Sequence, residues 1–425
     1  MKINLHKYAP VLCAIFYLLS TFLLFLFGSF EWPVNNTGLL VFFLVVCALG
    51  MLVGFVFGAE ISVSLEQSFE WRLFFRFGCV FSILLVAPST YAYTGKWPWE
   101  VFSLIGSQGI AYKQMLEALE LDQSGIRVYV SFVRGLTAPF VFCVIPFAVL
   151  RWKALNRVDV ALLAGHVLAV LIFSFMRGTD RETGDLVFTL LIAAYMLKLR
   201  SNNFEHKVRS VPIKKFFLCI LILIALVVFI DRKEARMGGT DSFCIADGLV
   251  CSRPSAESDP FFLKVQFGLD MFSAYLSQGY YGLSLSLNED FDSTYGVGHS
   301  SFLKSMYSRF SDGSVQNRTY IEKISDLGWD ARYQWSTIFP WIASDVGFPS
   351  VPLVVFLVFF LWGMAWTGSI RQKDDVSSVL FMLLAILVVY IPANNQLAQT
   401  LDGYLTFLFW LILFFFRVLK NRSMA

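Results

Sequence analysis

Long apolar stretches separated by short polar segments dominate the pattern of the chain. A helix that crosses a bilayer needs about 20 mostly apolar residues, somewhat fewer where basic residues flank it. Stretches that approach or exceed this length cover residues 9–30, 38–58, 73–93, 129–150, 158–175, 184–199, 216–230, 339–366, 376–391 and 401–419. The pattern predicts an all-α, polytopic integral membrane protein with about ten, and up to about 12, transmembrane helices.

The composition supports a membrane-embedded chain. Of the 425 residues, 57% are hydrophobic and only 15% are charged, whereas soluble globular domains carry about 25% charged residues. The formal net charge of +3 gives no indication of a surface for nucleic acid. These values exclude a soluble enzyme and make a nucleic-acid partner unexpected.

The distribution of Lys and Arg predicts the orientation in the membrane. With a cytoplasmic N-terminus, 18 of them fall on the cytoplasmic side, six in short outer loops or at adjoining helix ends, and ten in one long outer segment. Short cytoplasmic loops are enriched in Lys and Arg, and long translocated loops are exempt from this rule. We therefore expect both termini in the cytoplasm. The expected division is an N-terminal transmembrane bundle (1–230), a large outer loop (231–338) and C-terminal transmembrane helices (339–425).

Residues 95–127 form a second outer segment. Its apolar residues recur near helical spacing, which is typical of an amphipathic helix that lies in the outer membrane interface. A helix that packs on the outer loop is an equally good interpretation.

The long loop contains Cys244 and Cys251 within FCIADGLVC. Outside the reducing cytoplasm these two thiols are candidates for a disulfide. The sequence has no CxxC or HExxH spacing, so we predict neither a zinc site nor another cofactor.

Four arginines stand at the predicted outer ends of helices. Arg127 and Arg134 are seven residues apart and share one helix face, and Arg177 and Arg181 are four residues apart within FMRGTDRETGD. The guanidinium group binds phosphate oxygens bidentately and needs no metal to do so. The four residues are therefore candidates for binding a diphosphate.

Acidic residues are interleaved with the second arginine pair and offer a purely structural alternative. Asp180 and Asp185 are candidates for substrate binding, and Glu182 is a candidate catalytic residue together with Arg177 and Arg181. In the structural alternative, Arg177 pairs with Asp180, or Arg181 with Asp185, to neutralise the helix ends. For Arg127 and Arg134, snorkelling towards the interface is the corresponding alternative.

Aromatic and planar polar residues are concentrated in two parts of the long loop and its continuation, at 275–303 and 328–350. Aromatic faces stack on sugar rings, while planar polar groups satisfy sugar hydroxyls. The candidates for sugar binding are Tyr280, Tyr281, Trp329, Asp330, Arg332, Gln334, Trp335 and Asp345.

His299 is the only histidine in the predicted outer segments. An imidazole with a near-neutral pKa is a candidate general base. A lone histidine in a loop that is merely solvated remains the alternative.

In these regions the chain resembles Wzy-type polymerases of O-antigen or exopolysaccharide repeat units from the bacterial inner membrane. The resemblance covers most of the chain in topology and is carried by RGTDRETGD, by QGYYGLSLSL with the following YGVGHS, and by GWDARYQWSTIFPWIASDVGFP. It implies a GT-C-like architecture and a metal-independent glycosyl transfer on the periplasmic face. The substrate would be an undecaprenyl diphosphate-linked oligosaccharide, and a chain-length regulator would be a partner besides the membrane lipids.

The resemblance also implies roles for single residues. Arg177 and Arg181 would bind diphosphate, Arg127 or Arg134 would bind a second lipid carrier, and a base would activate or position the acceptor hydroxyl. Two other functions stay open: an O-antigen ligase, which transfers the polysaccharide to lipid A core, and a flippase of the lipid-linked unit. The hundred-residue outer loop argues against the flippase.

Overall fold

The structure is a computed structural model that describes residues 5–61, 69–104, 115, 125–179, 181–201, 243–246, 248–253, 259–311, 313–331 and 333–422. The described part is mostly helical, as predicted. By packing, the chain divides into two units, one made of Met1–Gln67 with Thr240–Ala425 and the other of Ser68–Gly239. This division follows packing, whereas the division predicted above follows the order of the segments along the chain.

Seven helices of the described part are long and apolar enough to cross a membrane: His6–Phe27, Thr37–Glu60, Trp71–Thr94, Ile126–Leu150, Arg157–Met176, Phe348–Arg371 and Leu401–Lys420. They coincide with seven of the predicted stretches. A shorter apolar helix covers Asp375–Val389, and residues 184–199 lie in a helix whose charged ends keep it out of this set. The predicted stretch 216–230 lies outside the described residues, as do most of residues 95–127. The protein is thus a helical, membrane-embedded protein.

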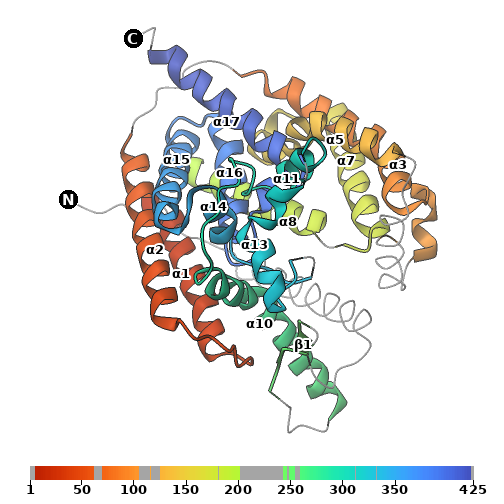
Figure 1. The fold of residues 1–425 in the computed structure, drawn as a ribbon. Helices are drawn as coiled ribbons and strands as arrows, with labels where there is room; N and C mark the ends of the chain where they lie inside the picture. The colour runs from red at the N-terminus through yellow and green to blue at the C-terminus, as the bar shows by residue number, and fades with distance from the viewer. Residues whose placement is uncertain are drawn as a thin grey trace. The chain divides into compact units, whose positions relative to one another are not determined.

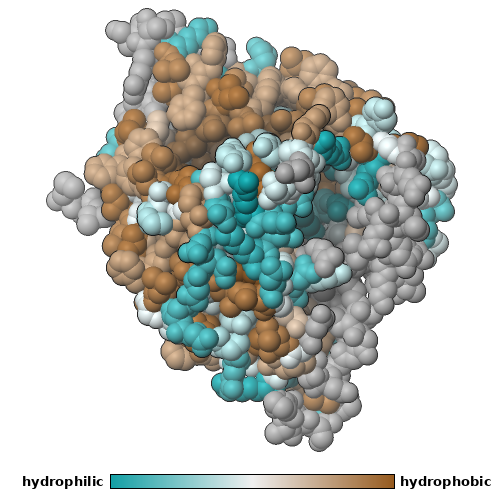
Figure 2. All heavy atoms as spheres, in the orientation of Figure 1, coloured by the Kyte–Doolittle hydropathy of each residue, from teal (hydrophilic) through white to brown (hydrophobic). Residues whose placement is uncertain are grey.

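The first unit combines the N-terminal helices with the C-terminal half of the chain. In chain order its elements are α1 Leu5–Phe27, α2 Thr37–Glu60, β1 Cys244–Ile245, β2 Val250–Cys251, α10 Pro260–Ser286, α11 Ser301–Ser308, α12 Ser314–Asn317, α13 Tyr320–Lys323, η3 Ile324–Leu327, α14 Ile338–Val346, η4 Phe348–Ser350, α15 Val351–Arg371, α16 Asp375–Val389, η5 Gln396–Ala398 and α17 Leu401–Arg422. In Figure 2 hydrophobic side chains gather over α1 and α2, and hydrophilic ones over the segment with α11 and α13.

Three glycines join α2 to α15 across a long stretch of sequence. Gly50, Gly54 and Gly58 recur every four residues on one face of α2, and a Cβ atom on any of them would overlap the backbone of α15. The carbonyls that it would meet at Gly54 and Gly58 belong to Phe356 and Phe360, so the two helices run in parallel. Small residues at this spacing let helix backbones approach closely in a membrane.

The predicted stretch 339–366 is not one helix. It is broken at Gly347, which has a φ of 72°, and the chain then continues through η4 into α15. A non-glycine residue rarely adopts this backbone conformation, and prolines at 349 and 352 fit the first turns of the helical segments that follow the break. The break leaves α14 as a separate nine-residue helix.

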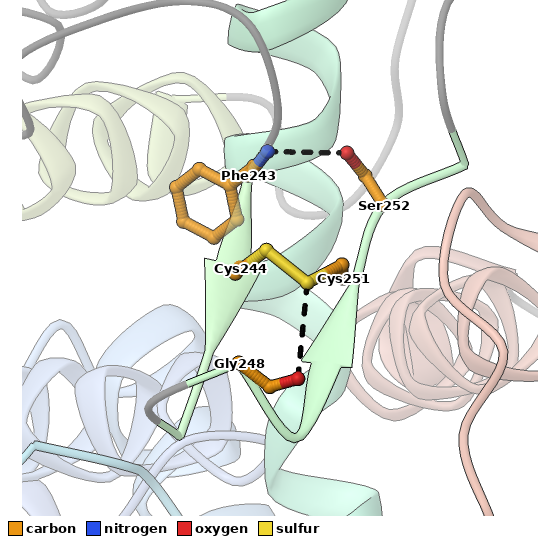
Figure 3. The surroundings of a disulfide bond; sticks show 5 residues. All are labelled: Phe243, Cys244, Gly248, Cys251 and Ser252. Atoms are coloured by element: carbon orange, nitrogen blue, oxygen red, sulfur yellow. Dashed lines mark hydrogen bonds between the residues drawn. A yellow bond between two sulfur atoms is a disulfide. The ribbon is translucent and has the colours of Figure 1, made fainter.

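The strands β1 and β2 form a small hairpin in which Cys244 and Cys251 are paired residues and their sulfurs are bonded (Figure 3). The backbone N–H of Phe243 donates a hydrogen bond to Ser252 Oγ in the same hairpin. Ser252 also pairs with Phe30 in an isolated bridge. The hairpin is thereby attached to the connection between α1 and α2.

The second unit is a bundle of α3 Trp71–Thr94, η1 Pro98–Leu104, α5 Ile126–Phe142, α6 Val144–Leu150, η2 Trp152–Ala154, α7 Arg157–Met176 and α8 Arg181–Ser201. At one end of the bundle, Asn156 and Asp159 form a capping box at the start of α7. The Asp159 carboxylate also accepts a hydrogen bond of 2.7 Å from Arg76 Nε on α3. This ion pair fastens α7 to α3.

Candidate functional site

His299 and Asp345 form a hydrogen-bonded pair in the first unit. His299 lies two residues before α11, and Asp345 lies in the last turn of α14. The distance from His299 Nδ1 to Asp345 Oδ2 is 2.6 Å, and the two side chains are 30% and 10% exposed. The imidazole is thus reachable from outside, while the carboxylate behind it is mostly shielded.

The surroundings of Asp345 favour its ionised form. Its carboxylate accepts hydrogen bonds from the backbone N–H groups of Gly298 (2.7 Å) and His299 (3.0 Å) and from the hydroxyl of Thr294. Burial by itself raises the pKa of Asp345, but the hydrogen bonds from His299, Thr294 and the two amides outweigh it and hold the pKa below its ordinary value. An ionised carboxylate only accepts hydrogen bonds, so Nδ1 of His299 carries a hydrogen, and in the neutral imidazole the free lone pair is on Nε2.

The local backbone explains why His299 meets Asp345. A Cβ atom on Gly298 would crowd the Thr294 hydroxyl and the Asp345 carboxylate, so the segment approaches α14 closely only because this position is glycine. The segment is also held from the other side. Asn395 Nδ2 donates to the carbonyl of His299 at 2.9 Å, and Ser300 Oγ donates to the carbonyl of Ala398 at 2.6 Å.

An apolar cavity of about 330 Å³ opens beside the pair. His299, Asp345 and Asn395 lie at its polar part, where the ring of Tyr404 stands 5.9 Å from the His299 ring between centroids. The rest of its wall comes from α2, α14, α15, α16, α17 and their connections: Met51, Ile338, Phe339, Ile342, Val346, Val354, Val355, Val358, Phe359, Leu387, Val388, Ile391, Leu397, Ala398, Phe407 and Leu408. A cavity of this kind fits an apolar group whose polar end faces the histidine.

In the second unit the structure brings Arg134 and Arg177 together. Both guanidinium groups lie over the ring of Phe173, at 4.2 and 5.2 Å from its centroid, and both also lie over the ring of Tyr93. Arg177 pairs with Glu182 in an ion pair. Its Nε is buried and has no hydrogen-bond acceptor among the described residues.

The other charged residues of this cluster are placed as follows. Arg181 forms an i, i+4 ion pair with Asp185 at 3.9 Å, which is the structural alternative considered above. Glu182 takes the role towards Arg177 that was considered for Asp180, and Asp180 itself lies outside the described residues. Arg127 is half-buried in the first turn of α5. Diphosphate binding by these arginines stays a prediction.

Three of the predicted sugar-binding aromatics are core residues of the first unit. Tyr280 is 1% exposed, and its hydroxyl hydrogen-bonds to Thr21 and Leu18 of α1. The rings of Tyr281 and Trp329 are also buried and stand 5.0 Å apart between centroids. In this structure the three side chains pack the interior of the unit, so a sugar ring would need other aromatic surfaces.

The remaining sugar-binding candidates follow Trp329 in the chain. Asp330, Gln334 and Trp335 are partly exposed, and the Trp335 ring contacts Tyr275 edge-on at 4.5 Å between centroids. The side-chain oxygen of Gln334 is buried without a donor among the described residues. Arg332 lies outside the described residues. Their role in binding sugar stays a prediction.

The sequence did not reveal that Asp345 is the partner of His299. The two residues are 46 positions apart, and no spacing rule links a loop histidine to a carboxylate at that distance. The cavity and Tyr404 were missed for the same reason. Only the glycine before the histidine and the polar segment after residue 393 hinted at close packing there.

No family model matches the chain, and neither the curated proteins nor the solved structures contain a match.

Proposed function

We propose that the protein is a glycosyltransferase that polymerises undecaprenyl diphosphate-linked oligosaccharide repeat units into O-antigen or exopolysaccharide on the periplasmic face of a bacterial inner membrane. The observation that carries the proposal is the His299–Asp345 pair at the polar part of an apolar cavity whose wall includes three membrane-length helices. The resemblance of the sequence to Wzy-type polymerases supports the same assignment.

The proposed chemistry follows from the hydrogen-bonding state of His299. Its free Nε2 accepts the proton of an acceptor sugar hydroxyl while that oxygen forms a bond to the anomeric carbon of the donor. The bond between the anomeric carbon and the diphosphate oxygen breaks, and the diphosphate leaves with the electron pair. Asp345 stabilises the imidazolium and keeps the ring in its productive tautomer.

The lipid carrier and its diphosphate need binding groups of different kinds. The cavity offers apolar wall to the part of the polyprenyl chain nearest the diphosphate. Taken by itself, the second unit offers Arg134 and Arg177 as candidates for a separate phosphate-binding site, because aromatic rings hold both guanidinium groups in place.

The test is transfer by the purified, reconstituted protein with labelled undecaprenyl diphosphate-linked repeat unit from its own source. We expect a ladder of increasing repeat number on a gel. His299→Gln should lower the rate about 10²–10⁴-fold, the typical contribution of a positioned base, while His6→Gln, a change near the N-terminus, should leave the ladder intact.

The other outcomes of this assay are equally definite. Transfer only when lipid A core is added would assign the protein as a ligase with the same base. A reconstituted protein that transfers to neither acceptor contradicts the proposal and returns the flippase to consideration. Full activity of His299→Gln would remove the histidine from the mechanism.

A further inference from the structure

Tyr295 is an exposed aromatic residue at the tip of a tight turn just before His299. Its φ is 56°, and the φ of the following Gly296 is 84°. The amide of Val297 donates a hydrogen bond of 3.2 Å to the carbonyl of Thr294. Positive φ values at both central positions together with this hydrogen bond are typical of a type I′ turn. Tyr295 is 65% exposed there.

Tyrosine is an unfavourable choice for this position of the turn. Type I′ turns prefer Asn followed by Gly, because these residues adopt a positive φ at the lowest cost. Gly296 meets this preference, but Tyr295 does not, and a bulky residue with a positive φ is rare. Since the backbone favours another residue and the side chain is not packed in the core, the position indicates a role for the exposed ring. Residues in such conformations cluster at ligand-binding and active sites.

Arg318 holds the Tyr295 ring in place. Its Nη1 donates a hydrogen bond of 2.8 Å to the Tyr295 hydroxyl, and its guanidinium carbon lies 5.3 Å from the ring centroid. The arginine is anchored in turn, because the next residue, Thr319, is buried and caps the start of α13. An aromatic ring that is fixed at its hydroxyl and still exposed loses little conformational freedom when a ligand stacks on it.

The turn belongs to the segment that encloses the carboxylate of Asp345. The Thr294 hydroxyl and the amides of Gly298 and His299 all donate hydrogen bonds to this carboxylate. Both ends of the segment are therefore fastened at one point. Four residues separate Tyr295 from His299, so their Cα atoms are at most about 14 Å apart. An oligosaccharide whose reacting sugar lies at His299 can extend over this distance.

The surroundings of Tyr295 are polar, unlike those of the apolar cavity. Among the described residues, His299 lines the cavity and Tyr295 does not. Arg318 lies between α12 and α13, in the part of the first unit where hydrophilic side chains gather (Figure 2), and it acts electrostatically on Asp292. A sugar ring presents its C–H face to an aromatic ring and its hydroxyls to polar groups. Tyr295 and its neighbours offer both.

We propose that Tyr295, held by Arg318, is a stacking site for a sugar ring of the acceptor repeat unit. The assignment to the acceptor rests on the proposed function, in which His299 takes the proton of the acceptor hydroxyl, so a sugar bound near His299 is the acceptor's. The stacking of a sugar on the ring does not depend on the transfer chemistry. Tyr295 is a binding residue here, not a catalytic one.

The experiment measures binding to the purified full-length protein in detergent by calorimetry. The probe is the repeat-unit oligosaccharide of the source bacterium, released from its lipid carrier by mild acid. We expect Tyr295→Asn to weaken binding about 2–10-fold, the usual effect of losing an aromatic contact. Tyr295→Phe, which keeps the ring, should retain most of the affinity. The matched control is Phe310→Leu, at an aromatic residue of the same unit that is 85% exposed, and its affinity should equal that of the wild type.

The melting temperature separates a binding role from a structural one. Asn suits a type I′ turn better than Tyr, so Tyr295→Asn should melt at or above the wild-type temperature while it binds the oligosaccharide more weakly. If Tyr295→Asn melts lower, Tyr295→Phe decides: wild-type affinity of this variant supports the proposal, and a loss as large as that of Tyr295→Asn overturns it.

The remaining outcomes distinguish the stacking site from the proposed function. In an active protein, Tyr295→Asn should raise the apparent KM for the lipid-linked repeat unit and leave kcat unchanged. A wild type that makes polymer while Tyr295→Asn keeps its affinity and KM rejects the stacking site alone. A wild type that makes no polymer but binds the oligosaccharide, with the loss in Tyr295→Asn, rejects the proposed function and keeps the sugar site. An equal loss in Phe310→Leu, or a wild type that does not bind the oligosaccharide, overturns the proposal.

Discussion

The carboxylate of Asp345 accepts four hydrogen bonds, from the Thr294 hydroxyl, the amides of Gly298 and His299, and the His299 ring. The two backbone amides can only donate, one to each carboxylate oxygen, so both oxygen positions require an acceptor. This requirement fixes both the ionisation of Asp345 and the tautomer of His299.

Replacement of Asp345 by Asn tests this requirement. The amide nitrogen would face at least one donor, and the imidazole would lose the charge that stabilises its protonated form. We expect transfer to fall about 10²–10⁴-fold and the melting temperature to fall as well. Asp326→Asn, at an exposed position in η3, should change neither quantity; a transfer rate of Asp345→Asn equal to the wild type would contradict the assigned role.

The low pKa of Asp345 predicts how its effect on stability depends on pH. Because the folded-state pKa lies below the ordinary value of 3.8, the ionised carboxylate stabilises the fold fully above about pH 4, and this contribution is lost as the pH falls through the folded-state pKa. Below about pH 4, where the Asp345 carboxylate becomes protonated, the difference in melting temperature between wild type and Asp345→Asn should shrink. A difference that grows below pH 4 would mean the opposite shift.

Helices α2 and α15 pack in backbone contact at Gly50, Gly54 and Gly58. The apolar pattern predicted both helices, but it did not predict their pairing. The glycine spacing in GMLVGFVFG is the signal that identifies the contact face, since lipid solvates leucine as well as a neighbouring helix does.

The break at Gly347 was missed for a related reason: hydropathy runs through α14 and α15 without interruption, and only the glycine and the prolines mark the turn.

Gly54→Val should separate the two helices. The added side chain meets the backbone of Phe356, which cannot rotate away, so we expect a loss of about 1–3 kcal/mol or more in stability and a matching fall in melting temperature. Gly38→Ala in the first turn of the same helix has open space around its Cβ position and serves as the control. Equal melting temperatures for Gly54→Val and wild type would show that the helices are not in backbone contact.

At the scale of the whole molecule, the membrane-length helices were predicted from hydropathy, and the orientation was predicted from charge. Seven of the ten predicted stretches match membrane-length helices, because lipid exposure demands continuous apolar length whatever the tertiary contacts are. The pairing of His299 with Asp345 depends on how distant segments pack, and this information is not local in the sequence.

The disulfide hairpin tests the predicted orientation in cells. Bacterial disulfides form in the periplasm and rarely in the cytosol, so a periplasmic Cys244–Cys251 pair should resist alkylation by a maleimide-polymer until a reductant is added. The readout is a mobility shift on a denaturing gel after the cells are lysed in denaturant that contains the reagent. The Cys244→Ser/Cys251→Ser double variant supplies the background; thiols that react fully without reductant would place the segment in the cytoplasm.

The pairing of α2 with α15 also bears on biosynthesis. About 290 residues separate the end of α2 from the start of α15, and ribosomes extend a chain by about 5–20 residues per second. The glycine face of α2 is therefore without its partner helix for about 15–60 seconds after α2 has been synthesised. The second unit is translated during that interval. The first unit can therefore complete its packing only after α15 and the helices that follow it have been synthesised.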